Sequence, residues 1–255
     1  CSHDPSFLSL AAMITIVLFY VVTDIAFRWE LARWASAFAF ALTMIFGLNE
    51  IKIPAVLNGL ILMTLALTYL IGGYALKNFE KKLSAALPLY LASYGVAAFV
   101  TLQAIVSAPF NGSDNLAKVL IGDVILLIVS AIVHRQYVWV YGATTLFIVP
   151  AFIYAKLFLP DAVNQGIVLG GLMVIYVIAA FAGSVRTTRL SDPFLTAAAL
   201  ISIITTTLTW KNPISVTVML SLITILYITV ALWRKWSWLL LPALGFLNLG
   251  IFTGM

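Results

Sequence analysis

The sequence predicts an all-α, polytopic integral membrane protein of about ten transmembrane helices in a single domain that covers residues 1–255. Of these residues 63% are hydrophobic and only 9% are charged, whereas a soluble domain has about 25% charged residues. Too few charged side chains are therefore present to cover a surface that faces water. The apolar residues form unbroken runs about twice as long as a barrel strand. Such runs predict helices, because helices and closed barrels are the structures that satisfy every backbone hydrogen bond in lipid.

Ten apolar runs define the expected helices, since about 20 apolar residues are needed to cross the hydrocarbon core. The second run has only 15 residues, so we expect this helix to be tilted, re-entrant or extended into its flanks. The runs occupy residues 7–27, 34–48, 55–76, 84–106, 117–133, 137–159, 163–183, 193–210, 213–232 and 236–255.

Short polar connections separate the runs, and several contain proline, which stops a helix or begins the next one. Pro54 precedes the third run, and Pro160 and Pro213 mark two later boundaries. The longest polar stretch, residues 107–115, includes the glycosylation sequon at Asn111. None of these connections is long enough to be a linker between domains.

Lys and Arg are distributed unevenly between the two sides of the expected helices. Ten of the 14 follow odd-numbered runs, and four lie on the other side. Because cytoplasmic loops are enriched in basic residues, the asymmetry predicts a multi-pass protein of the cell (plasma or inner) membrane with both termini outside. The ten are Arg28, Arg33, Lys77, Lys81, Lys82, Arg135, Arg186, Arg189, Arg234 and Lys235, and the four are Lys52, Lys118, Lys156 and Lys211.

The basic loops recur with a period of about 50 residues, and each interval holds one outgoing and one returning helix. One interpretation is five helical-hairpin repeats, an internal symmetry found in transporters and repeat arrays. The other is that any ten short helices with tight loops acquire this period from the thickness of the bilayer. Weak residue identity between the intervals favours the second interpretation. Aromatic residues near these loops, including Trp236 and Trp238, are interpreted as an interfacial belt.

Single residue types exclude further classes of protein. One cysteine and two histidines leave no internal disulfide, no pair of haem ligands and no metal-binding cluster. No nucleotide-binding or hydrolase motif occurs in the sequence. We therefore expect no enzymatic activity, no cofactor, no metal and no nucleic-acid partner. His134 closes the fifth run and is expected to be an interfacial residue rather than a pH sensor or ligand.

Two acidic residues fall within apolar runs, where an ionisable group is costly and is a functional candidate. Asp123 is placed about one or two turns into the fifth run, in Ile121-Gly122-Asp123-Val124. It is either a structural or interfacial hydrogen-bonding group, or a contact for a proton, a cation or a substrate. Asp24 precedes Arg28 by four residues, a spacing that predicts an interfacial ion pair on one helix face.

Hydroxyl residues at helical spacing lie in the eighth and ninth runs, so that each set occupies one helix face. They either line a path for a small substrate or bond between helices and back to carbonyls of their own helix. The second interpretation is favoured. The two sets are Ser202, Thr206 and Thr209, and Thr217, Ser221 and Thr224.

Two GxxxG sequences predict close packing of helices, because glycine lets two backbones approach each other. The first joins Gly166 to Gly170 and the second joins Gly250 to Gly254. At the start of the chain, Cys1 followed by Ser2 has the form of a mature bacterial lipoprotein. Cys1 is therefore a candidate for lipidation, although a truncated chain explains the same residues and is favoured.

Two functions remain after these exclusions. The favoured one is a non-catalytic integral subunit or scaffold that packs against the lipid bilayer and other membrane protein chains in a larger complex. The near absence of ionisable residues within the runs supports it. The alternative is a small-molecule or lipid transporter that uses Asp123 and the hydroxyl seam between helices eight and nine.

Overall fold

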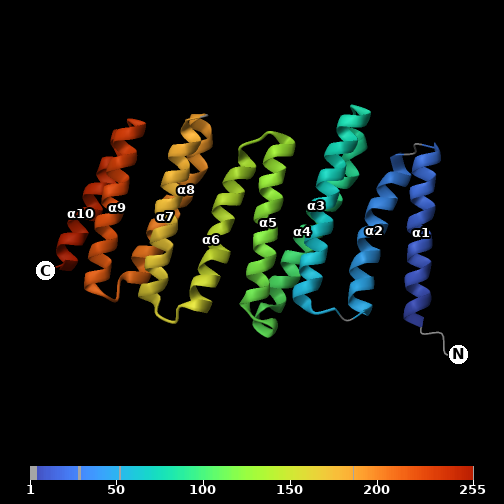
Figure 1. Cartoon of the computed structure of the whole chain (residues 1–255), viewed down its shortest axis with the longest axis horizontal. Coiled ribbons are helices and arrows are strands. Elements are labelled where there is room, and N and C mark those ends of the chain that lie inside the picture. Colours follow the sequence, from blue (N-terminus) through green and yellow to red (C-terminus); the bar gives the residue numbers. More distant parts are fainter. Residues whose placement is uncertain (1–4, 28–29, 52, 186, 255) are drawn as a thin grey trace. The chain divides into compact units, whose positions relative to one another are not determined.

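The chain is an all-α integral membrane protein, as its sequence predicts (Figure 1). A computed structural model describes residues 5–27, 30–51, 53–185 and 187–254. Within these ranges the chain forms ten α-helices and one 3-10 helix, with no strand. The chain divides into two compact units, Cys1–Gln136 and Tyr137–Met255, each of which is described by itself. The single membrane domain of the sequence analysis stays a prediction.

The first unit contains five helices, and the second contains five helices and the 3-10 helix η1. Eight helices, α2 to α9, are long and apolar enough to cross a membrane. The helices of the first unit are α1 (Pro5–Phe27), α2 (Glu30–Glu50), α3 (Ala55–Glu80), α4 (Leu83–Asn111) and α5 (Ser113–His134). Those of the second unit are α6 (Val138–Phe158), α7 (Ala162–Ser184), α8 (Thr188–Thr209), α9 (Pro213–Arg234), η1 (Ser237–Leu239) and α10 (Leu240–Gly254).

The second helix is extended into its flanks, which was one of three expectations for its short apolar run. It has 21 residues because Glu30 and Arg33 form its first turns and Asn49 and Glu50 its last. Polar residues at both ends of a transmembrane helix reach the interface with water. A count of apolar residues leaves these polar residues out, although they belong to the helix.

Basic residues end three of the helices in the same way. Lys81, Arg135 and Lys235 are the C-caps of α3, α5 and α9, and their φ angles of 55°, 54° and 55° lie in the left-handed region. A left-handed residue at this position stops the helix. A positive side chain there also complements the negative end of the helix dipole.

The core of the first unit lies where α3 packs against α4 and α5. Leu62, Leu70 and Val100 are fully buried there. The Tyr69 hydroxyl donates a 2.7 Å hydrogen bond to the carbonyl oxygen of Ala37 in α2 and so joins α3 to α2. A buried tyrosine hydroxyl thus finds its acceptor on the neighbouring helix.

The core of the second unit lies where α7 packs against α8. Leu169, Met173 and Ile201 are fully buried in it. The Tyr176 hydroxyl donates a 2.9 Å hydrogen bond to the carbonyl oxygen of Thr144 in α6. This bond joins α7 to α6 as the Tyr69 bond joins α3 to α2.

The two tyrosine bonds belong to a repeated arrangement. Each spans 32 residues, and residues 58–74 of α3 correspond in register to residues 165–181 of α7. Glycine, tyrosine, isoleucine and two leucines recur at five of these positions, and a buried amide precedes the glycine in both helices. α5 and α9 are both 22 residues long. The two units therefore share a framework of four successive helices, α2 to α5 and α6 to α9.

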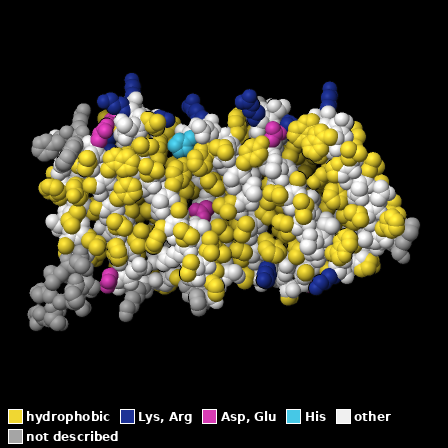
Figure 2. All heavy atoms as spheres, turned by 180° about the vertical axis from the view of Figure 1, so that it is seen from behind, with side chains coloured by type: hydrophobic (Ala, Val, Ile, Leu, Met, Phe, Trp, Pro, Cys, Tyr) yellow, Lys and Arg dark blue, Asp and Glu magenta, His cyan; other side chains and the backbone are white. Residues whose placement is uncertain are grey.

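Consecutive helices pack along each other in α1/α2, α3/α4, α7/α8 and α9/α10. The third hairpin of the expected repeat, α5/α6, crosses the boundary between the units, so the five-hairpin repeat stays a prediction. Figure 2 shows hydrophobic side chains over the surface between the helix ends, while Lys and Arg gather at the ends. Such a surface fits a bilayer, whose hydrocarbon contacts the apolar band and whose interface holds the charges.

Candidate functional site

Asp123 lies at the middle of α5, deeper than the sequence predicted. The helix begins at Ser113, so Asp123 stands ten residues from its start in a helix of 22 residues. At 1.5 Å of rise per residue, either end is about 15 Å away. The expected depth was wrong because the polar first turn, residues 113–116 with Asp114, was not counted as helix. Asp114 and Lys118 form an i,i+4 ion pair of 2.6 Å on these turns.

The hydrogen-bond partner of Asp123 is a threonine of the neighbouring helix. Thr101 of α4 donates from Oγ1 to Asp123 Oδ2 at 2.5 Å. Next to Asp123, Gly122 faces Met63 of α3, where a Cβ atom would come within 3.1 Å of Met63 Cγ. A carboxyl group bonded by one hydroxyl fits a structural role, and its role toward a proton, cation or substrate stays a prediction.

The hydroxyl set on α8 faces the core of the second unit. Ser202 and Thr209 are fully buried, and Thr206 is partly exposed. Ser202 donates to the Ala199 carbonyl and lies 3.3 Å from the Tyr227 hydroxyl of α9. Most hydroxyls of this helix donate to carbonyls three or four residues before them. Such bonds satisfy a hydroxyl within its own helix.

The hydroxyl set on α9 points toward α10 rather than toward α8. Thr217 lies 3.1 Å from the Thr253 hydroxyl, and Thr224 is buried 3.5 Å from the Ala243 carbonyl. Ser221 is exposed and donates to the carbonyl of Thr217. The structure thus places the two sets on different interfaces. Their role as substrate contacts stays a prediction.

The first GxxxG sequence lies where α7 meets two helices. A Cβ atom at Gly166 would come within 2.7 Å of Thr209 Cγ2, and one at Gly170 within 2.8 Å of Met219 Sδ. Gly250 of the second sequence faces Leu220 of α9 at 3.5 Å, an ordinary contact. Gly254 ends α10. Close approach is therefore required most clearly at Gly166 and Gly170. Cys1, the candidate for lipidation, lies outside the described residues.

A buried arginine joins four helices at one end of the first unit. Arg33 of α2 donates from Nε to Asp24 of α1 at 3.0 Å, and its Nη2 lies 3.1 Å from Glu80 of α3. Nη1 also donates to the Ala85 carbonyl of α4 at 3.5 Å. The described partner of Asp24 is thus Arg33, whereas Arg28, its expected partner, lies outside the described residues. A single guanidinium compensates two carboxylates here.

His134, at the end of α5, packs against two tyrosines of α4. Its Nε2 lies 3.1 Å from the Tyr94 hydroxyl, and its ring meets the edge of Tyr90 with 5.0 Å between centroids. Tyr94 also donates to Ser130 at 2.9 Å. The described residues include no group of three His, Cys, Asp or Glu side chains that could hold a metal ion.

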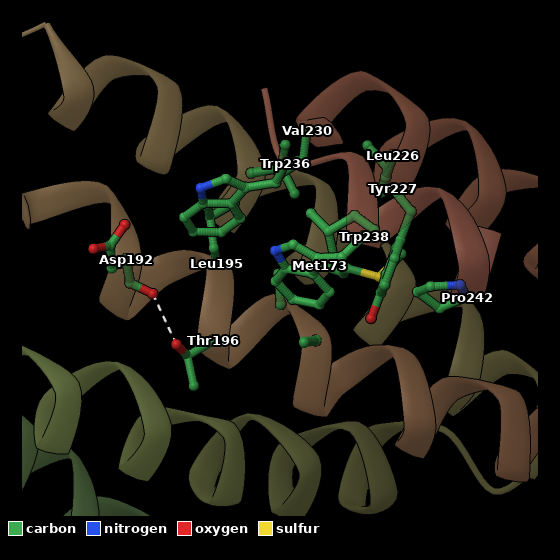
Figure 3. A pocket seen from close by; sticks show the side chains of 14 residues that line it. Met173, Asp192, Leu195, Thr196, Leu226, Tyr227, Val230, Trp236, Trp238 and Pro242 are labelled. Atoms are coloured by element: carbon green, nitrogen blue, oxygen red, sulfur yellow. Dashed lines mark hydrogen bonds between the residues drawn. The ribbon is translucent and has the colours of Figure 1, made fainter. Parts of the chain in front are cut away.

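A cavity with a volume of about 400 Å³ lies in the second unit. This size falls within the range of small-molecule sites, about 300–1,000 Å³. In Figure 3 the rings of Trp236, Trp238 and Tyr227 stand on one side of the cavity, and Asp192 and Thr196 on another. The other lining residues are Met173, Val177, Leu195, Ala198, Ala199, Leu226, Val230, Leu239 and Pro242.

The cavity lies near the end of the unit that carries its basic residues. Asp192 belongs to the first turns of α8, and Trp236 lies two residues after the end of α9. Its lining is mostly apolar, with Asp192 as its one charged residue. Because tryptophan is enriched at the level of lipid head groups, the cavity is placed where an amphiphilic molecule has its polar part.

An arginine holds Asp192 at the edge of this cavity. Arg234 of α9 donates from Nη2 to Asp192 Oδ1, and from Nη1 to the Thr188 carbonyl of α8 at 3.4 Å. Its guanidinium also lies over the ring of Trp236, 4.6 Å from the centroid. The Arg234 side chain is 11% exposed. The ion pair therefore ties the end of α9 to the start of α8 and neutralises the carboxylate.

Sequence reasoning missed this site, although two signals point to it. Asp192 is one of only two acidic residues in residues 137–255, and it lies just before an expected helix rather than within one. The tryptophans near Arg234 were assigned to an interfacial belt. Because 42 residues separate Asp192 from Arg234, only the packing of α8 on α9 brings the residues together.

Comparison with known proteins identifies no relative of this chain: no family model, no curated protein and no solved structure matches it. Function must therefore be argued from the geometry.

Replacing Arg33 with Gln is expected to lower the free energy of unfolding by about 3 kcal/mol, since it leaves two partly buried carboxylates uncompensated. Denaturant titration in detergent micelles measures this loss. Lys118→Gln removes the more exposed ion pair with Asp114 and is the matched control, with an expected loss below about 1 kcal/mol. Equal losses in the two variants would contradict the central role of Arg33.

Replacing Thr101 with Val is expected to cost about 1–3 kcal/mol, because Asp123 then lacks its hydroxyl partner within an apolar span. Asp123→Asn should cost less, since the amide oxygen can still accept the bond from Thr101. Thr64→Val, at an exposed threonine that bonds only to its own helix, controls for the loss of a hydroxyl. The same titration measures all three, and a Thr101→Val variant as stable as Thr64→Val would refute the structural role of this bond.

Proposed function

We propose that this integral membrane protein is a transporter that binds a small amphiphilic molecule or lipid in the second unit. The observation that carries the proposal is the cavity of about 400 Å³ with an apolar lining and a polar edge. A site for a small molecule is typically a mostly apolar cavity with a few polar groups that orient the ligand. No comparable feature of the described residues supports a scaffold role.

The position of the cavity supports a ligand that comes from the bilayer. Thr196, Trp238 and other lining residues are exposed at the outer surface of the helices, which is the surface that lipid covers. A molecule in the bilayer therefore has access to the cavity without leaving the hydrocarbon. Tyr227 and Thr196 supply hydroxyl groups within it.

Filling the cavity is expected to abolish binding. Ala199→Phe places a ring among the lining residues and should reduce labelling by a neutral diacylglycerol with a photoreactive acyl chain about tenfold. The labelling is read in peptides that contain residues 192–199 and 226–242. Ala182→Phe adds the same ring at an exposed position of α7 and should leave the labelling unchanged. Equal labelling in all proteins, or none in the unmutated protein, would contradict the proposal and favour the scaffold.

We also propose that the basic loops lie in the cytoplasm of a cell whose plasma or inner membrane holds the chain, with both termini outside. The support is the excess of Lys and Arg after α1, α3, α5, α7 and α9. Cysteine introduced at Ser113 should react with an impermeant thiol reagent from outside intact cells, in a chain whose Cys1 is replaced. Cysteine at Ser184 should react only after permeabilisation. The reverse pattern would invert the topology.

A further inference from the structure

Beside the cavity lies a second, more polar hollow that shares one wall with it. Ser184, Thr188, Trp233, Arg234 and Trp236 line this hollow, and Trp236 also lines the apolar cavity. The two hollows therefore adjoin at the Trp236 ring. The cavity on one side of Trp236 has a mostly apolar lining. The hollow on the other side is lined by the Arg234 guanidinium and the hydroxyl groups of Ser184 and Thr188.

The charge around the polar hollow is positive. The described residues 187–192 and 234–236 contain three basic residues and a single acidic one, Asp192. Arg189 and Lys235 are exposed at this end of the unit. Asp192 is already paired with Arg234, so the edge of the cavity offers no uncompensated carboxylate to a cationic ligand.

Arg234 retains the capacity to bind an anion. A guanidinium has five N–H donors, and the contacts within the described residues use two of them, to Asp192 and to the Thr188 carbonyl. Its stacking on Trp236 fixes its plane beside the shared wall. A guanidinium held in one orientation is suited to two parallel bonds with the oxygens of a phosphate or carboxylate.

Building on the function proposed above, we propose that the ligand is an anionic amphiphile. Its phosphate or carboxylate head group binds Arg234 in the polar hollow, with Ser184 and Thr188 at its sides. Its apolar part passes Trp236 and occupies the 400 Å³ cavity. The head group shares the Arg234 guanidinium with Asp192, which thereby weakens the binding of the anion.

The test uses the full-length protein in detergent and quenching of its tryptophans by phosphatidic acid with brominated acyl chains. Arg234→Gln is expected to weaken binding about tenfold or more, the effect of losing a hydrogen bond to a charged group. Lys211→Gln removes an equal charge at the opposite ends of α8 and α9 and should have no effect. Trp238→Phe should reduce the quenched fraction, which locates the brominated chain in the cavity.

Asp192→Asn distinguishes an anion site from a cation site, because it should strengthen the binding of an anion and weaken the binding of a cation. It removes the competing carboxylate while keeping an oxygen that can accept a bond from Arg234. Phosphatidic acid should then bind about fivefold more tightly, the effect of one unit charge about 4 Å away in water. Weaker binding, or tighter binding of brominated dodecyltrimethylammonium by the unmutated protein, would overturn the anionic class.

Two further probes distinguish the remaining outcomes. Inorganic phosphate should not displace the brominated lipid at equal concentration, because it gains nothing from the cavity; full displacement would show a site for free phosphate and overturn the proposal. Brominated phosphatidylcholine should bind more weakly than phosphatidic acid. If the two bind equally and Ala199→Phe abolishes both, the cavity is an amphiphile site without charge selection. If no probe binds, the proposed function itself fails.

Discussion

The interior of a bilayer offers no water to a polar group, and the rest of this structure follows from that constraint. Helices satisfy their backbone internally, so polar side chains within the spans bond either to carbonyls that are already bonded or to one another, as Thr101 does to Asp123. Threonine and serine hydroxyls mostly donate to carbonyls of their own helix. Tyr69 and Tyr176 are long enough to reach a neighbouring helix, and each bonds α3 or α7 to the helix before it.

Apart from Asp123, which bonds to Thr101 at the middle of α5, the ion pairs lie near helix ends. Arg33 pairs with carboxylates of α1 and α3 and also donates a hydrogen bond to a carbonyl of α4. Arg234 of α9 pairs with a carboxylate of α8. A buried pair gains little net stability, because desolvation offsets the attraction, but removing one partner leaves a costly unpaired charge. These arginines therefore specify which helix ends meet.

The number and approximate limits of the helices could be predicted, because the energy of transferring a run of residues to hydrocarbon depends on its composition alone. Their polar ends could not, and for that reason the depth of Asp123 was misjudged and the extent of α2 was left open among three alternatives. The ion pairs between helices could not be predicted from the sequence, because their partners lie far apart in it. Arg33 and Glu80 are 47 residues apart, and Asp192 and Arg234 are 42 apart. Hydropathy indicates that a helix spans the membrane, but it does not indicate which face of that helix packs against which neighbouring helix.

The repeated framework carries different side chains at two equivalent helix ends. α5 and α9 have the same length and end at left-handed basic residues, so His134 and Arg234 occupy equivalent last positions. In the first unit two tyrosines of α4 pack against His134, whereas in the second a carboxylate and tryptophans surround Arg234. Aromatic rings pack against the last residue of α5. The last residue of α9 instead forms an ion pair beside the cavity. The ion pair of Asp192 and Arg234 beside the cavity is thus particular to the second unit at this position, and this difference favours a binding role for that unit.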